Sequence, residues 1–118
     1  MKTVLWISRH NMTPDQLDDL ERIMNGPVCL RPWRDTVTDA ASLALAVREA
    51  DAVAAVLPPE LLAELLRLAE GKPVFTAVSE RVPTGQTVKG PSGPEPEFAF
   101  VHRCWRQLLR LEIEMRTL

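Results

Sequence analysis

Apolar residues gather in four short runs, of which only the last is interrupted, by Thr76, and segments with helical periodicity separate them. The runs cover residues 4–7, 28–30, 52–57 and 73–78. Successive side chains of a strand point to opposite faces of the sheet, so an unbroken apolar run is typical of a strand that is buried on both faces. The pattern therefore predicts four strands of a sheet that is covered on both sides.

Three predicted helices lie between these runs, and the first has the clearest boundaries. Thr13 suits the N-cap, Pro14 suits the first helical position, and Gln16 completes a capping box with Thr13. Asn25-Gly26-Pro27 ends this helix with typical breakers. The other two predicted helices cover residues 40–50, after a cap at Thr38 or Asp39, and residues 60–70, which Gly71 closes.

Strand and helix alternate up to residue 78, which indicates a parallel sheet with helices on its faces. Four short strands of this kind predict a small α/β domain that is Rossmann-like (flavodoxin-like), with the strand order 2-1-3-4. The length of 118 residues predicts a single domain.

Residues 79–118 have a different character and predict a β-rich extension. Residues 84–88 and 97–101 are expected to pair as a hairpin around the turn at residues 90–93. In the tail, residues 109–116 alternate apolar and charged side chains, which favours a strand, although an apolar helical face also fits there. Because the last strand of the sheet would otherwise be an open edge, we expect the hairpin and the tail to extend the sheet or to form a small sheet against it, and to contribute most of a homodimer interface. The apolar contacts expected in that interface are Phe98, Phe100, Leu109, Leu111, Ile113 and Met115.

Composition narrows the classes of function. The chain is 46% hydrophobic and 25% charged with a net charge of −2, which is typical of a globular protein and excludes binding to duplex nucleic acid through a broadly basic surface. No apolar run approaches the roughly 20 residues of a membrane-spanning helix, and no secretory signal begins the chain. Two cysteines without metal-ligand spacing predict reduced thiols and no metal. We therefore expect a cytoplasmic protein without membrane contact, metal or other cofactor.

The candidate site lies where parallel strands end at one edge of the sheet, since open α/β sheets bind ligands there. The residues predicted to reach this edge are Ser8, Arg9, His10 and Asn11 after the first strand, Thr13 at the helix start, Arg34 after the second strand, and Ser79 and Arg81 after the fourth. The arginines and the N–H groups of the first helix favour an anion, above all a phosphate. His10 is the candidate for proton transfer near neutral pH.

Each of these residues also has a purely structural interpretation. Ser8 can cap a turn, Arg9 can be a solvated charge, His10 can be an exposed histidine, Asn11 can take a left-handed turn conformation, and Arg81 can pair with Glu80. Trp33, on a loop, can stack on a base or simply pack. The sequence contains no glycine-rich phosphate loop, no zinc-ligand spacing and no nucleophile elbow, which removes those enzyme classes.

The segment Ile7-Ser8-Arg9-His10, followed by Met12-Thr13-Pro14-Asp15-Gln16, resembles the start of small CRISPR-associated Rossmann-fold proteins. Some of these begin with a Ser-Arg-His turn, and others with a Ser-His turn followed by Leu-Thr-Pro-Glu-Gln. The group includes ring nucleases, which degrade cyclic oligoadenylate second messengers, and relatives that only bind them. Arg9-His10 also resembles the Arg-His-Gly motif of histidine phosphatases, but Asn11 stands in place of the glycine.

The resemblance to the CRISPR-associated proteins implies a cyclic oligonucleotide ligand and roles for three residues. Ser8 and Arg9 would contact the ligand, and His10 would take part in metal-independent cleavage of a phosphodiester. A symmetric ring would suit a two-fold homodimer. The alternative is an ancillary binding or interaction protein that performs no catalysis.

Overall fold

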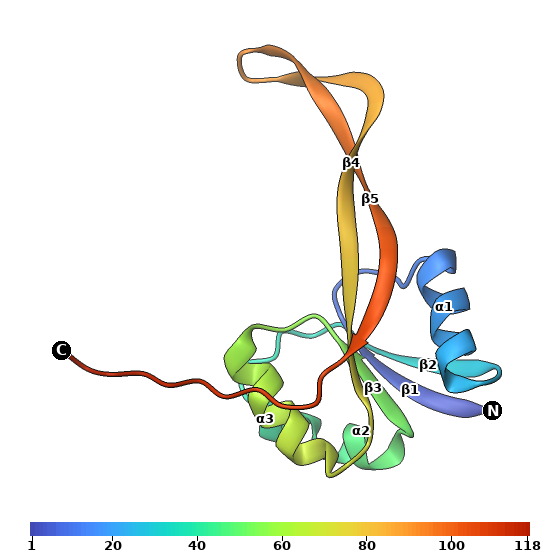
Figure 1. The fold of residues 1–118 in the computed structure, drawn as a ribbon, viewed down its shortest axis with the longest axis vertical. Coiled ribbons are helices and arrows are strands. Elements are labelled where there is room, and N and C mark those ends of the chain that lie inside the picture. Colours follow the sequence, from blue (N-terminus) through green and yellow to red (C-terminus); the bar gives the residue numbers. More distant parts are fainter.

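The computed structural model describes residues 1–118 and contains one five-stranded sheet with helices on both faces (Figure 1). In chain order the elements are β1 (Lys2–Ile7), α1 (Pro14–Met24), β2 (Val28–Trp33), the 3₁₀ helix η1 (Ala40–Leu43), α2 (Ala44–Glu49), β3 (Ala52–Ala55), α3 (Pro59–Ala69), β4 (Val74–Gly90) and β5 (Gly93–Gln107). The strand order is β2-β1-β3-β4-β5. The predicted Rossmann-like α/β class and the order 2-1-3-4 are confirmed.

The strands β1 to β4 are parallel, and β5 joins β4 in the antiparallel sense. Because consecutive side chains point to opposite faces, the sheet has two cores. On one face α1 covers Val4, Trp6 and Ala54 through Leu20 and Met24. On the other face η1, α2 and α3 cover the sheet through buried side chains that include Leu43, Val47 and Leu65.

The start of α1 follows its sequence signals closely. The Thr13 hydroxyl accepts a hydrogen bond from the Gln16 amide at 3.2 Å, and the Gln16 side chain accepts one from the Thr13 amide at 2.9 Å. Asn25 ends the helix in the left-handed conformation. This capping box holds the chain that links β1 to α1, which is the segment with most of the predicted site residues.

Several predicted boundaries are wrong in instructive ways. β2 runs on to Trp33 and includes Pro32, which an edge strand tolerates because one side of it donates no hydrogen bonds to a neighbour. The predicted helix 40–50 begins as a 3₁₀ turn, and Asp39, one of the two predicted caps, caps it. β3 ends at Ala55, two residues earlier than predicted.

The predicted hairpin turn is confirmed, but its arms are longer and differently paired than expected. β4 and β5 are 17 and 15 residues long, and Thr87 pairs with Pro96 rather than with a residue of the segment 97–101. We call residues 79–103 the arm, and residues 1–78 with 104–107 the body. Figure 1 shows the arm as a twisted ribbon of two strands that projects from the body.

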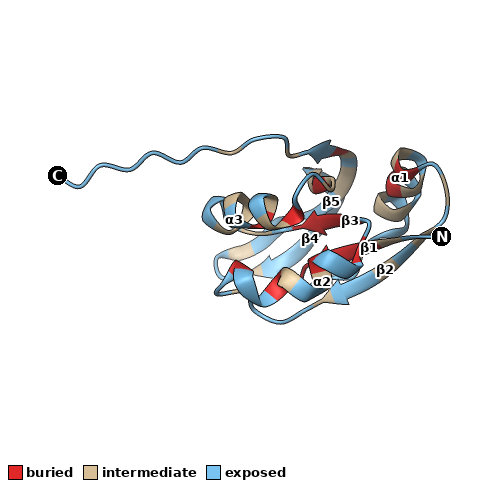
Figure 2. Cartoon of the chain, turned by 90° about the horizontal axis from the view of Figure 1, so that it is seen from below, coloured by how far each residue is buried: buried red, intermediate tan, exposed pale blue.

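The prediction of a strand in the tail is wrong. The Leu108 amide still donates to the Val74 carbonyl at 2.8 Å, but residues 108–118, which we call the tail, form no helix or strand. β5 already occupies the edge that the tail was expected to cover, so the alternating pattern finds no strand to pair with. Figure 2 shows buried residues on β1, β3 and the inner sides of the helices, and a largely exposed tail. No helix is long and apolar enough to cross a membrane.

Candidate functional site

A pocket of about 260 Å³ opens where β1, β2 and β3 end. Its polar lining consists of Ser8, Arg9, Asp35 and Thr36, and its apolar lining consists of Ile7, Trp33, Val37, Val56, Leu57, Pro58 and Leu61. This is the strand-end edge at which the sequence placed the site. Of the predicted residues, Ser8 and Arg9 line the pocket.

Hydrogen bonds to the backbone fix Ser8 in the wall of the pocket. It is 9% exposed, and its amide donates to the Trp33 carbonyl at 3.2 Å, which joins the end of β1 to the end of β2. Its hydroxyl oxygen accepts a hydrogen bond from the His10 amide at 3.1 Å. Ser8 therefore shapes the turn, and its hydroxyl proton remains able to donate to a ligand.

Arg9 is the cation of the pocket. Its Nη2 donates to the Thr36 hydroxyl at 2.6 Å, and this bond links the loop after β1 to the loop after β2. A guanidinium group has five N–H donors, so most of them remain free for a second acceptor. Asp35, a carboxylate, lies in the same lining and limits how many negative charges the pocket accepts.

Trp33 forms part of the apolar wall, at the end of β2 rather than on the loop where the sequence placed it. The Trp33 indole Nε1 is buried and has no hydrogen-bond partner. A buried donor without a partner costs about 1–3 kcal/mol in typical cases, and a bound acceptor at this wall of the pocket would offset that cost.

His10 and Asn11 are exposed and lie outside the pocket lining. The backbone of His10 is fixed at both ends, because its amide donates to Ser8 and its carbonyl accepts from Trp6 Nε1 at 2.9 Å. Asn11 accepts a hydrogen bond from Arg34, so these two predicted residues contact each other. The structure thus brings together Ser8 with Arg9, and Asn11 with Arg34.

The N-terminus of α1 offers less to an anion than the sequence suggested. Pro14 has no N–H, the Gln16 amide donates to the Thr13 hydroxyl, and the Leu17 amide donates to the Thr13 carbonyl at 2.9 Å. Only the amide of Asp15 remains free, and the carboxylate on the side chain of that residue would repel an anion. Thr13 is therefore engaged in capping, and Arg9 is the cationic side chain in the pocket lining.

Ser79 and Arg81 were placed at this edge because the fourth strand was expected to end at residue 78. That boundary is wrong: β4 continues to Gly90, and both residues lie on the arm, outside the pocket lining. The Arg81 guanidinium lies 3.8 Å from the centre of the Phe98 ring. Ser79 pairs with His102 in the strand register.

Sequence reasoning missed a polar junction between α1 and the root of the arm. His102 Nε2 lies 2.9 Å from Asp19 Oδ2, and the His102 side chain is only 6% exposed. Hydrogen bonds from His102 and Arg22 lower the pKa of Asp19. Next to it, Trp105 Nε1 donates to the Gln16 carbonyl at 2.9 Å. Asp19 and His102 are 83 residues apart on different elements, so no local sequence pattern predicts their contact.

The pocket combines a guanidinium, a hydroxyl group and apolar walls, which together can bind a phosphate attached to a flat apolar group. No group of three or more His, Cys, Asp or Glu side chains is arranged to hold a metal ion. Comparisons with protein-family models, with curated proteins and with solved structures give no match for this chain.

Proposed function

We propose that the protein binds a phosphate-bearing nucleotide of the cyclic oligoadenylate type in the pocket at the ends of β1, β2 and β3. The observation that carries the proposal is the placement of Arg9 beside the apolar wall that contains Trp33. The guanidinium suits a phosphate, and the apolar wall suits a base. The N-terminal resemblance to CRISPR-associated proteins supports the choice of ligand class.

The size of the pocket supports a shared site. Pockets that enclose a small ligand usually have volumes of about 300–1,000 Å³. A pocket of about 260 Å³ fits one nucleotide unit of a larger ring. The remaining units would need a second surface, and a homodimer provides one because the two-fold axis repeats the pocket. We place this activity in the cytoplasm, where Cys29 and Cys104 stay reduced.

The chemistry that would follow binding is cleavage of the ring without a metal. The 2′-oxygen of a ribose attacks the adjacent phosphorus, the bond from phosphorus to the 5′-oxygen breaks, and a 2′,3′-cyclic phosphate remains. A base takes the 2′-proton, and the leaving 5′-oxygen gains a proton. His10 is the candidate for these transfers, and Arg9 for stabilising the charge on the phosphate.

A second candidate function is binding without cleavage, as in an ancillary ligand-binding or interaction protein. The exposed position of His10, outside the pocket lining, favours this alternative. Proton transfer requires a heavy-atom distance of about 2.6–3.2 Å, so cleavage requires the imidazole to reach the ligand from the rim.

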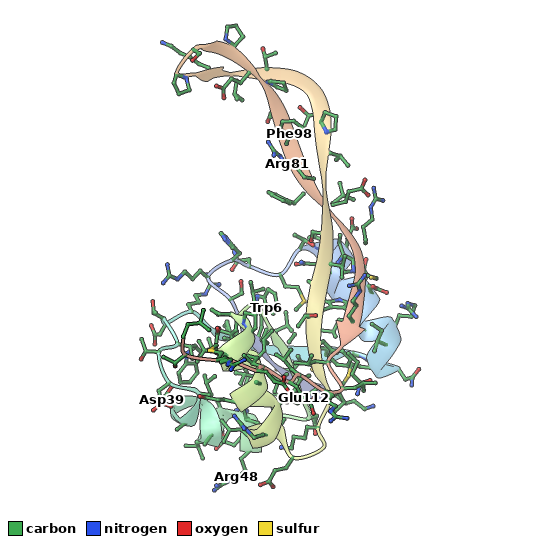
Figure 3. The ribbon with its side chains drawn as sticks, turned by 60° about the vertical axis from the view of Figure 1, so that its left-hand side comes forward. Trp6, Asp39, Arg48, Arg81, Phe98 and Glu112 are labelled. Atoms are coloured by element: carbon green, nitrogen blue, oxygen red, sulfur yellow. The ribbon has the colours of Figure 1, made fainter.

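The test is calorimetric titration of the purified protein with cyclic tri-, tetra- and hexa-adenylate, with a chelator present. Arg9→Ala should weaken binding at least about tenfold, because a charge-assisted hydrogen bond is lost. Arg48→Ala is the matched control: it removes the same charge from α2, at the end of the body away from the arm (Figure 3). No binding of any ring, or equal affinity in the two variants, would contradict the proposal.

Chromatography of the same mixtures separates the two candidate functions. Linear or 2′,3′-cyclic phosphate products that disappear in His10→Ala would establish cleavage. Intact rings after prolonged incubation, with the affinity of His10→Ala close to that of the original chain, would establish a binding protein.

A further inference from the structure

The arm and the extended tail give the molecule more surface than a chain of this size normally exposes. The radius of gyration is 16.8 Å, whereas a compact chain of 118 residues has about 13.5 Å. The accessible surface is 8323 Å², against about 6,400 Å² expected for a folded monomer of 13.2 kDa. About 1,900 Å² of surface is therefore in excess.

One face of the arm continues a face of the core. Residues that pair directly across an antiparallel ladder share a face, and the register joins Ala77 to Trp105, Ser79 to His102, Arg81 to Phe100 and Pro83 to Phe98. Residues 77, 79, 81 and 83 also share a face, since they alternate along β4. Trp105, His102, Phe100 and Phe98 of β5 therefore form one stripe.

The helix α1 covers this stripe only as far as the root of the arm. Trp105 is 8% exposed and packs in the core beneath α1, and the His102 side chain meets Asp19 of α1. Beyond them Phe98 is 40% exposed and Phe100 is 76% exposed. The stripe thus leaves the core and runs onto the arm, where no helix or strand of the chain covers it.

Arg81 adds an interface-like feature to this face. Its guanidinium stacks on the Phe98 ring, and Figure 3 shows the two side chains close together along the arm. Arginine and aromatic residues are enriched in the centres of protein interfaces, and lysine is depleted there. Stacking also limits the side-chain motion that an interface would otherwise have to restrict.

The charge of the arm helps to select the partner. Residues 79–103 contain three cations and three anions, which are Arg81, Lys89, Arg103, Glu80, Glu95 and Glu97. With no net charge, the arm has no preference for a polyanion or a polycation, and two identical arms approach without net repulsion.

We propose that the Phe98–Phe100 face of the arm is the contact through which two copies of this chain associate. A stable interface buries about 800 Å² on each partner, and the excess surface, which the arm shares with the tail, is more than twice this amount. A two-fold contact uses the same patch on both copies, which an apolar and electrically neutral face permits. The inference rests on the homodimer part of the proposed function and not on the ligand.

The experiment is sedimentation of the full chain without nucleotide, over a range of micromolar concentrations. We expect twice the mass of the single chain. Phe100→Ser should raise the dimer dissociation constant at least about tenfold, because central aromatic residues dominate such contacts. The side chain is largely exposed within one chain, so the variant should keep the far-ultraviolet circular dichroism of the original.

Two further variants make the test decisive. Phe98→Ser should also weaken the dimer, whereas Leu45→Ser, which removes an exposed leucine from α2, should not. A monomer at every concentration, or a dimer that neither phenylalanine variant weakens, would overturn the inference. Because no nucleotide is present, a failure here is separate from a failure of ring binding.

Discussion

In the body β1, β2 and β3 are each followed by a helical segment that covers a face of the sheet, whereas the arm pairs only with itself. All 20 buried residues belong to the body, and none belongs to the arm. The body is stabilised by burial of apolar surface on two faces of the sheet, and the arm by a ladder of backbone hydrogen bonds. An isolated pair of strands is only marginally stable in water, so the arm depends on its root and on whatever covers its face.

The largest effect should come from a charge inside the body. Leu5 is 2% exposed in the middle of β1, and Leu5→Asp would bury a carboxylate without a partner, at a cost of several kcal/mol. We expect no soluble folded protein, as judged by soluble yield and circular dichroism. Leu45→Asp introduces the same charge at an exposed leucine and should fold normally. A folded Leu5→Asp protein would contradict the description of β1 as a central buried strand.

A smaller loss of stability is expected from a substitution at the root of the arm, and almost none from a matched substitution on the arm. Trp105 meets Trp6 edge-on, with the ring centres 5.9 Å apart, and donates to the Gln16 carbonyl. Trp105→Ala should lower the free energy of unfolding by about 3–5 kcal/mol. The matched change on the same face, Phe100→Ala, should lower the stability of a single chain by less than about 0.5 kcal/mol. Denaturant titration at low protein concentration measures both, and equal losses would contradict the conclusion that Trp105 stabilises the single chain and Phe100 does not.

The junction between α1 and the arm should give a pH-dependent effect. Because hydrogen bonds lower the pKa of Asp19 in the folded protein, its carboxylate stabilises the fold above the ordinary value of 3.8, and this stability is lost as the pH falls through the lower folded pKa. Asp19→Asn should cost on the order of 1–2 kcal/mol at neutral pH.

Urea titrations of Asp19→Asn and the original chain at several pH values provide the measurement. The difference between the two proteins should shrink once the pH falls below about 4. Asp18→Asn changes an exposed neighbour on the same helix and should show no such trend. A difference that is constant with pH would exclude a role for the charge of Asp19.

The smallest effect is expected from the tail. Residues 111–115 lie beside α3, but Leu111 is the only half-buried residue beyond Leu108. Removal of residues 109–118 should change the free energy of unfolding by less than about 0.5 kcal/mol and leave the oligomeric state, measured by sedimentation, unchanged. Aggregation or dissociation of the shortened chain would instead support the sequence-based prediction that the tail forms part of the homodimer interface.

These contrasts explain how much of the structure could be predicted from the sequence. The strand runs and the capping box of Thr13 and Gln16 are local signals, and they predicted the body with its strand order. Prolines at positions 83, 94 and 96 interrupt the alternation that would have marked the full length of the arm. The tail has the pattern of a strand, but a strand also needs a free neighbour, which no local pattern reports.

The candidate site divides in the same way. Ser8 and Arg9 follow directly from the end of β1, and both line the pocket as predicted. Ser79 and Arg81 were misplaced because the end of β4 was misjudged. The contact between Asp19 and His102 depends on how α1 packs against β5, which is a property of the assembled fold rather than of either segment.

The register of β4 and β5 slips by one residue at the root of the arm. Val78 pairs with Cys104 and Ser79 pairs with His102, so Arg103 is an extra residue in β5. If Arg103 paired with Ser79 in a regular ladder, the alternation along β5 would reverse above it, and Phe98 and Phe100 would face the side of the sheet that α2 and α3 cover. The bulge at Arg103 therefore keeps Phe98 and Phe100 on the side of the sheet that carries α1. Deletion of Arg103 would close the ladder without turning these side chains over, because Ser79 and His102 would still pair.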